Sequence, residues 1–292
     1  MTATRRFEFV QLEFPWALGP EPGRYAIRER LGEPPAHILV LRTLGAPQRR
    51  LLPARRRPRD AQLEPPPAPA PTSRATLVDT AALDSRDAAE SRLRRADLER
   101  LADAAVARLN RVLHAHRVAV ADPYARDVAR EQALVVRVGY GDGEHVAEGR
   151  WDSARELPAS APRGGALAGR ERSAAALRPQ ERLAAVLAGR DAVLACEELA
   201  LRARSDVDAG RLREAALQLR VAFEAALAEL EPWREQAALA ERLLRLRARR
   251  DEVAAAADAA LRGGLDDEHV EAVRAVLACV EAALRARTAG GL

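Results

Sequence analysis

Two short stretches of the chain hold side chains of the kinds that act as acids, bases and anion-binding groups. In the first, Asp122 is a candidate general base, and Arg126, four residues later, is a candidate anion-binding group. In the second, Glu144 and His145 are neighbours in a glycine-rich segment and form a candidate acid–base pair. An enzyme or small-ligand binder with its site around residues 122–151 requires these four groups to converge in one pocket.

Each stretch also has a structural interpretation, which we favour. The pair Asp122-Pro123 is typical of a helix start, where aspartate caps the first turn and proline occupies its first position. The glycines of GYGDG do not match a dinucleotide-binding loop, which needs a third glycine where Glu144 stands. A Walker phosphate loop needs a lysine, and the chain contains none.

Asp142-Gly143 predicts a β-hairpin with a two-residue type I′ turn, because this turn needs positive φ and favours Asp-Gly. The register of such a turn sets which residues oppose each other: Gly141 with Glu144, Tyr140 with His145, Val138 with Ala147, Arg137 with Glu148, and Leu134 with Trp151. One face of the hairpin would then cover a helix with the following side chains: Leu134, Val136, Val138, Tyr140, His145, Ala147 and Trp151.

The remaining metal-ligating residue types do not form a recognisable site. Cys196 and Cys279 are far apart, and neither has a second cysteine or a histidine at ligand spacing. His114 and His116 lie in a helical pattern, where residues two apart do not share a face. We therefore expect neither a metal nor a cofactor.

Positive charge is concentrated near the start of the chain. All 47 basic residues are arginines, and the net charge of +4 divides into +7 over residues 1–59 and −3 over the remainder. Six of the arginines form a basic segment: Arg49, Arg50, Arg55, Arg56, Arg57 and Arg59. Such a segment binds nucleic-acid phosphates by releasing counterions, although no aromatic side chains stand between the arginines to stack on bases.

The first elements that would position these groups are short strands. Residues 1–46 predict a small β meander, beginning with the alternating segment 7–14, in which Glu8, Val10, Leu12 and Phe14 share one face. Residues 47–73 are rich in arginine and proline and cannot bury enough apolar surface to order the backbone. We predict a disordered linker there.

Residues 74–158 are predicted to complete an α+β N-terminal domain, a small antiparallel sheet plus a long helix. A strand is expected at 75–80, followed by one amphipathic helix from about 84 to 118. The Asp-Pro pair would start a short helix at 124–132, and the hairpin would follow.

The rest of the chain is predicted to be helical. Residues 159–172 are rich in glycine, proline and serine and indicate a loop or linker. Residues 173–292 predict an all-α bundle, or a short stack of helical repeats. Its clearest helices are expected at 212–230 and at 232–263, with a last helix capped by Asp266 or Asp267.

Composition and motifs together favour a non-enzymatic protein. The N-terminus has no signal-peptide pattern, and no window is apolar enough for a membrane span, so we expect a cytoplasmic protein. The long amphipathic helices predict a protein-interaction or scaffold protein that binds a partner, or itself, through its C-terminal helices. A nucleic-acid-associated protein using residues 49–59 and an enzyme or ligand binder using residues 122–151 are the alternatives.

Overall fold

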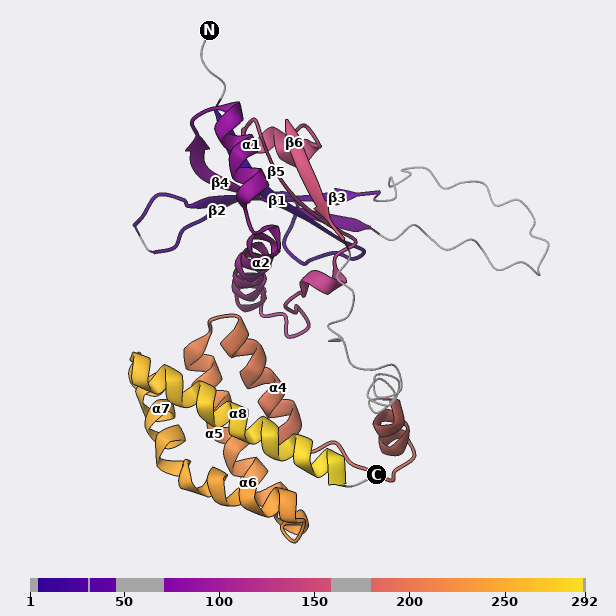
Figure 1. Cartoon of the computed structure of the whole chain (residues 1–292), viewed down its shortest axis with the longest axis vertical. Coiled ribbons are helices and arrows are strands. Elements are labelled where there is room, and N and C mark those ends of the chain that lie inside the picture. Colours follow the sequence, from indigo (N-terminus) through magenta and orange to yellow (C-terminus); the bar gives the residue numbers. More distant parts are fainter. Residues whose placement is uncertain (1–4, 31, 46–70, 159–179, 291–292) are drawn as a thin grey trace, which may run out of the picture. The chain divides into compact units, whose positions relative to one another are not determined.

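The computed structural model describes residues 5–30, 32–45, 71–158 and 180–290. The chain divides into two compact units, Met1–Gly164 and Gly165–Leu292. The first combines an antiparallel sheet with helices, and the second is helical (Figure 1), so the predicted fold class is confirmed. No helix within the described ranges is long and apolar enough to cross a membrane.

The sheet of the first unit has six antiparallel strands in the order β2-β3-β4-β1-β5-β6. The strands are β1 Arg6–Phe14, β2 Gly23–Ile27, β3 His37–Leu44, β4 Thr72–Leu83, β5 Val135–Gly141 and β6 Ser153–Leu157. The prediction of a meander over 1–46 is wrong in its connectivity, because β1 lies between β4 and β5 and not beside β2. Both faces of β1 are covered, Leu12 on one side and Phe9 on the other, which is why this strand is central.

Strand β4 begins inside the predicted linker. It starts at Thr72, one residue before the predicted end of that linker at residue 73, and it continues to Leu83, beyond the expected strand at 75–80. Its alternation of Ser73, Ala75 and Leu77 on the buried face explains the early start. The part of the linker at 46–70 lies outside the described residues.

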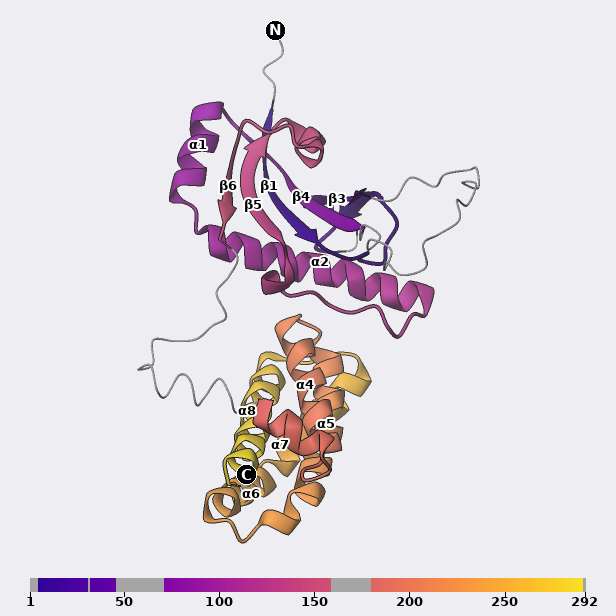
Figure 2. The same ribbon diagram turned by 90° about the vertical axis from the view of Figure 1, so that its right-hand side faces the viewer.

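Two helices, α1 Arg86–Arg95 and α2 Leu98–Val120, pack on one face of this sheet (Figure 2). The single helix predicted over 84–118 is therefore wrong. Ala96 adopts an extended conformation, and the Asp97 carboxylate caps α2 by accepting a hydrogen bond from the Arg100 amide. Buried residues of the two helices contact the sheet and form the main core with it: Ala89, Leu93, Ala102, Ala105, Val106, Leu109 and Leu113.

The predicted two-residue turn at Asp142-Gly143 is wrong. β5 and β6 do form an antiparallel pair, but a 3-10 helix, η2 Gly143–Glu148, lies between them. The observed register places Arg137 opposite Glu156, with 3.0 Å between Nη2 and Oε2, so the predicted pairs of Arg137 with Glu148 and of Leu134 with Trp151 do not form.

Burial of apolar side chains explains the longer connection. Val146 in η2 is buried with Phe9 and Val78 on the sheet face opposite α1 and α2. A two-residue turn would have kept Val146 in a strand. Glycine at positions 139 and 141 permits the close approach, because a Cβ at Gly139 would lie 2.4 Å from the Ser153 carbonyl oxygen and one at Gly141 would lie 2.7 Å from Val146 Cγ1.

The segment from α2 to β5 is mostly irregular. The helix predicted over 124–132 is wrong except for one 3-10 turn, η1 Arg130–Gln132. Asn110 of α2 fixes this segment by two hydrogen bonds to the backbone of Val128, at 2.9 and 2.8 Å. These bonds satisfy the N–H and C=O groups of Val128, which helical hydrogen bonds would otherwise have satisfied.

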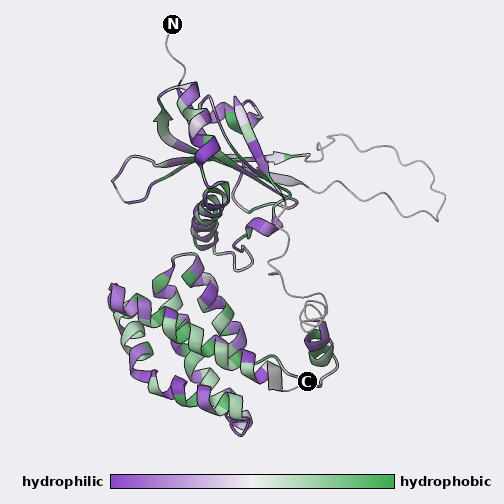
Figure 3. Ribbon diagram, viewed as in Figure 1, coloured by the Kyte–Doolittle hydropathy of each residue, from purple (hydrophilic) through white to green (hydrophobic). Residues whose placement is uncertain are grey.

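The second unit is built from helices α4 Ala195–Asp208, α5 Leu212–Glu229, α6 Ala237–Ala248, α7 Arg250–Arg262 and α8 Asp267–Gly290, with a 3-10 turn η3 Glu231–Trp233. Residues 180–187 are helical as well. Each of these helices carries both apolar and polar residues (Figure 3). The predicted core positions are buried: Leu239, Leu243, Val273 and Leu277. The single helix predicted over 232–263 is wrong, because Arg249 leaves helical geometry between α6 and α7.

Candidate functional site

The first predicted site residues, Asp122 and Arg126, lie in the irregular segment after α2. Asp122 Oδ1 accepts a hydrogen bond of 2.8 Å from the Tyr124 amide, and no helix begins at Pro123. The predicted helix cap is therefore a turn cap. Arg126 is exposed to solvent.

The second pair, Glu144 and His145, lies in η2. Glu144 forms an ion pair with Arg24, at 2.5 Å between Oε1 and Nε. The exposed His145 imidazole lies 3.2 Å from the Arg150 guanidinium and 3.8 Å from the Glu148 carboxylate. The Arg24 pair links η2 to β2, whereas the His145 contacts are local to η2 and the residues directly after it.

The structure does not bring the two pairs together. α2 and the segment after it belong to one side of the sheet, whereas η2 packs on the opposite face. Among the contacts of the described residues, none joins Asp122 or Arg126 to Glu144 or His145. The basic segment from Arg49 to Arg59 lies outside the described residues.

A pocket that the sequence analysis did not predict lies between the helices and the sheet, and we call it the His37–Arg108 pocket. Its inner cavity of about 180 Å³ is lined by Glu8, Phe9, Val10, His37, Leu77, Asp79, Arg92, Leu101, Ala105 and Arg108. An outer depression of about 740 Å³ shares four of these residues, Glu8, Arg92, Leu101 and Arg108, and so adjoins the cavity. The outer part adds Arg95, Ala96, Asp97, Arg100 and Ala104.

Three strands and two helices supply the polar groups of this pocket. His37 begins β3 and is the Cα partner of Asp79 in β4. Glu8 of β1 binds Arg92 of α1, with 2.8 Å between Oε2 and Nε. Arg108 extends from α2. Ala96 and Asp97, which form the break between α1 and α2, line the outer depression.

Two nitrogen atoms of the pocket are buried without a hydrogen bond. Within the described part of the chain, neither His37 Nδ1 nor Arg108 Nε has a hydrogen-bond partner. The nearest acid to Arg108 Nε is Glu29, at 3.9 Å from Oε1, and Glu29 is already bound by both terminal nitrogens of Arg111, at 2.9 and 3.0 Å. Buried donors and acceptors are normally satisfied, so these two atoms distinguish the polar part of the pocket from its apolar walls.

Burial and charge set the protonation states in the pocket. Burial lowers the pKa of His37 below its usual 6.5, and the positive charge of Arg108 lowers it further, against the opposing effect of Asp79. The hydrogen bond from Arg111 lowers the pKa of Glu29. The hydrogen bond to Glu8 raises the pKa of Arg92. The pocket therefore presents a neutral imidazole beside charged guanidinium groups at neutral pH.

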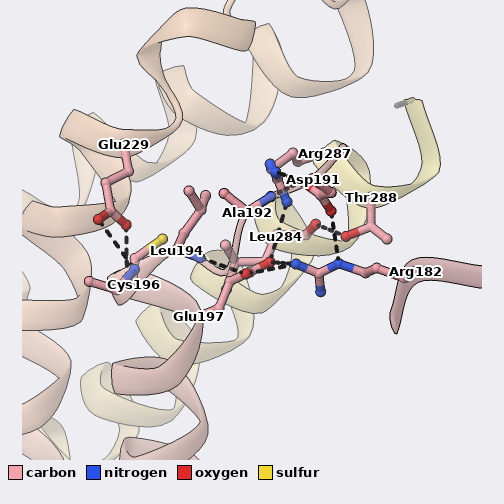
Figure 4. Close-up of polar contacts among 11 residues, drawn as sticks. Arg182, Asp191, Ala192, Leu194, Cys196, Glu197, Glu229, Leu284, Arg287 and Thr288 are labelled. Carbon is pink, nitrogen blue, oxygen red and sulfur yellow. Dashed lines mark hydrogen bonds and ion pairs between the residues drawn. The ribbon is translucent and has the colours of Figure 1, made fainter. Parts of the chain in front are cut away.

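The helical unit holds a second cluster of polar groups (Figure 4). Arg182 binds both oxygens of Glu197, at 2.6 and 2.7 Å, and Asp191 at 3.3 Å. Arg287, only 6% exposed, binds Asp191, lies 3.6 Å from Glu197 and stacks its guanidinium 4.7 Å from the centre of the Trp233 ring. These pairs fasten the helix at 180–187 to α4 and α8, which is a structural role.

Cys196, beside this cluster, is not an activated nucleophile. Glu229 accepts hydrogen bonds from the amides of Ala195 and Cys196 at the start of α4, at 3.2 and 2.9 Å. Burial, with the neighbouring Glu229 carboxylate, raises the pKa of Cys196 to about 12, so the thiol stays protonated. Among the described residues, no group of histidine, cysteine, aspartate and glutamate side chains is placed to hold a metal ion.

Comparisons with protein-family models, with curated protein sequences and with solved structures find no match for this chain.

Proposed function

We propose that this chain is a non-enzymatic protein-interaction or scaffold protein, and that its helical unit binds a protein partner or a second copy of the chain. The observation that carries this proposal is the outer face of the helix at 180–187. Leu183 and Leu187 lie one turn apart and are 51% and 78% exposed, and Val193, shortly after, is 65% exposed. Covering a large aliphatic side chain contributes about 1.5–3 kcal/mol, so this face is suited to a partner.

The opposite face of the same helix is anchored, which fixes the leucines in place. Ala185 is buried, and Arg182 is held by Glu197 and Asp191. Leu183 and Leu187 are thus presented by a helix that is already ordered before a partner arrives. An ordered contact surface loses less conformational entropy on binding than a flexible one.

The polar groups of the helical unit support an interaction role over catalysis. The charges of Arg182, Asp191 and Glu197 are engaged with one another, and the Cys196 thiol is protonated. Nucleic-acid binding by residues 49–59 stays a prediction, and binding that falls steeply with salt concentration would support it.

The proposal is tested with the double variant Leu183→Ser/Leu187→Ser in the full chain. Its matched control is Leu201→Ser/Leu244→Ser, which removes two leucines of comparable exposure from α4 and α6. Light scattering after size exclusion, at several protein concentrations, measures self-association. Crosslinked capture from the native lysate, with the captured proteins identified, measures partner binding.

We expect the wild-type chain and the control to self-associate or to retain the same identified partner, and the double variant to lose that association. A wild-type chain that stays monomeric and retains no partner would overturn the proposal. Equal association of the double variant and the control would overturn it as well.

A further inference from the structure

We propose that the His37–Arg108 pocket of the N-terminal unit binds a small monocarboxylate, with its carboxylate on Arg108 and its apolar body in the inner cavity. This inference is independent of the interaction surface on the helical unit. It concerns a different unit of the chain and a different class of ligand.

The Arg108 Nε, which has no hydrogen-bond partner among the described residues, indicates an anion. Arg108 Nε is buried and donates no hydrogen bond to any described group, and its nearest acid, Glu29, is 3.9 Å away and engaged by Arg111. Guanidinium groups offer donors in a planar fork that fits the two oxygens of a carboxylate. A carboxylate on Arg108 would remove the cost of leaving its Nε unsatisfied.

The walls of the inner cavity indicate an apolar body. Beside the charged groups, the lining contains Val10, Leu77, Leu101 and Ala105. Its volume of about 180 Å³ is below the roughly 300–1,000 Å³ of pockets that hold drug-sized molecules. The ligand is therefore small, with room for a short aliphatic chain.

The charges of the whole pocket indicate a single negative charge on the ligand. Its combined lining contains four arginines and three acids: Arg92, Arg95, Arg100, Arg108, Glu8, Asp79 and Asp97. The net charge of these seven groups is +1. Within them, Glu8 already neutralises Arg92. The acids would repel a polyphosphate or a nucleic-acid backbone, whereas a monocarboxylate matches the balance.

In this arrangement His37 would contact the second carboxylate oxygen. His37 lines the cavity, and its buried Nδ1 lacks a hydrogen-bond partner among the described residues. In the tautomer protonated at Nδ1, the neutral imidazole donates a hydrogen bond. The charged groups that act on His37 are Arg108, Asp79, Glu29 and Arg111.

The test uses saturation-transfer NMR on the full chain with hexanoate, hexanol and inorganic phosphate as probes. Hexanol has the same chain without the carboxylate, and phosphate has the charge without the chain. The variant Arg108→Met keeps an apolar stem and removes the guanidinium. Arg94→Met, on the exposed side of α1 and outside the pocket, is the control.

We expect hexanoate to bind the wild-type chain and the Arg94→Met variant, and Arg108→Met to weaken this binding by roughly tenfold or more. In the wild-type chain, hexanoate should also shift the imidazole resonances of His37, a measurement that needs no variant. The proposal is overturned if no hexanoate binds, if hexanol binds as tightly, if phosphate displaces hexanoate at equal concentration, or if Arg108→Met binds like the wild type.

Discussion

His37 and Asp79 stand opposite each other across the β3–β4 pair, on the sheet face that α1 and α2 cover. The same face of the two strands continues with Leu39 and Leu77, which are buried in the main core. The core of the N-terminal unit thus changes from apolar to polar within one residue pair. The two side chains line a cavity there, and His37 Nδ1 finds no hydrogen-bond partner among the described residues.

The burial of His37 predicts a pH dependence of stability. Because burial lowers its pKa below 6.5, the unfolded chain binds a proton that the folded chain does not bind between the two pKa values. The free energy of unfolding should therefore rise with pH through this window and be lower in acid. Urea unfolding at about pH 7.5 and about pH 5.5 should show a larger loss for the wild type than for His37→Gln.

The control for that measurement is His145→Gln, which replaces an exposed imidazole of the same unit. Comparing the two variants separates the loss of the buried imidazole from the loss of an exposed one. If His37→Gln shows the full wild-type loss, the pH dependence does not arise from His37.

The second prediction concerns the effect of replacing Arg108 on the free energy of unfolding. A buried donor without a partner costs about 1–3 kcal/mol, so Arg108→Met should leave the free energy of unfolding unchanged or raise it by about 1 kcal/mol. Arg111→Met, which breaks the bidentate pair with Glu29, should lower it by up to about 1 kcal/mol. Urea unfolding compares the two variants. A loss above about 1 kcal/mol for Arg108→Met would contradict this prediction, because it exceeds what the Glu29 pair at 3.9 Å contributes and shows that the guanidinium is already stabilised in the folded chain.

The sequence contains a signal for this pocket, although its meaning depends on strand pairing. Glu8 shares its strand face with Val10, Leu12 and Phe14, and a charged residue on an apolar face needs a partner. That partner, Arg92, is 84 residues away. Local periodicity predicts which face a residue occupies, but not which distant element covers that face. For this reason the fold class was predictable and the pocket was not.

The β5–β6 connection shows a different limit of local reasoning. The preference of Asp-Gly for a tight turn is real, and Gly143 does have a positive φ of 52°. Burial of Val146 against Phe9 outweighs that preference, and this contact depends on residues more than 130 positions apart in the chain. The favourable match of Arg137 with Glu148 was also misleading, because Glu156 satisfies the same arginine.

The close approach of β5 and β6 gives a third prediction. A methyl group at Gly139 would lie 2.4 Å from the Ser153 carbonyl oxygen and 2.8 Å from Ala154 Cα, so Gly139→Ala must displace β6. We expect a loss of about 1–3 kcal/mol in the free energy of unfolding, measured by urea titration. Gly23→Ala in β2 is the control, because its nearest neighbour would lie at 3.7 Å, an ordinary contact. Equal stabilities of the two variants would contradict the close packing of Gly139 against β6.

The last prediction links the polar cluster of the helical unit to its exposed leucines. Glu197 accepts two hydrogen bonds from Arg182 and one from the Leu194 amide, and it lies 3.6 Å from the buried Arg287. Glu197→Gln removes the negative charge and leaves Asp191 as the remaining acid of the cluster. Breaking a buried pair typically costs about 3–5 kcal/mol, and we expect a loss near the lower end because Asp191 remains.

The neighbouring variant Glu198→Gln is the matched control. Its carboxylate is exposed and pairs with Arg202 one turn away on α4, an interaction worth about 0.5 kcal/mol or less. Hydrogen exchange should show faster exchange of residues 180–187 in Glu197→Gln than in Glu198→Gln. Because this helix carries Leu183 and Leu187, Glu197→Gln should also weaken partner binding or self-association without altering either leucine. Unchanged exchange and unchanged association would show that the cluster does not hold this helix in place.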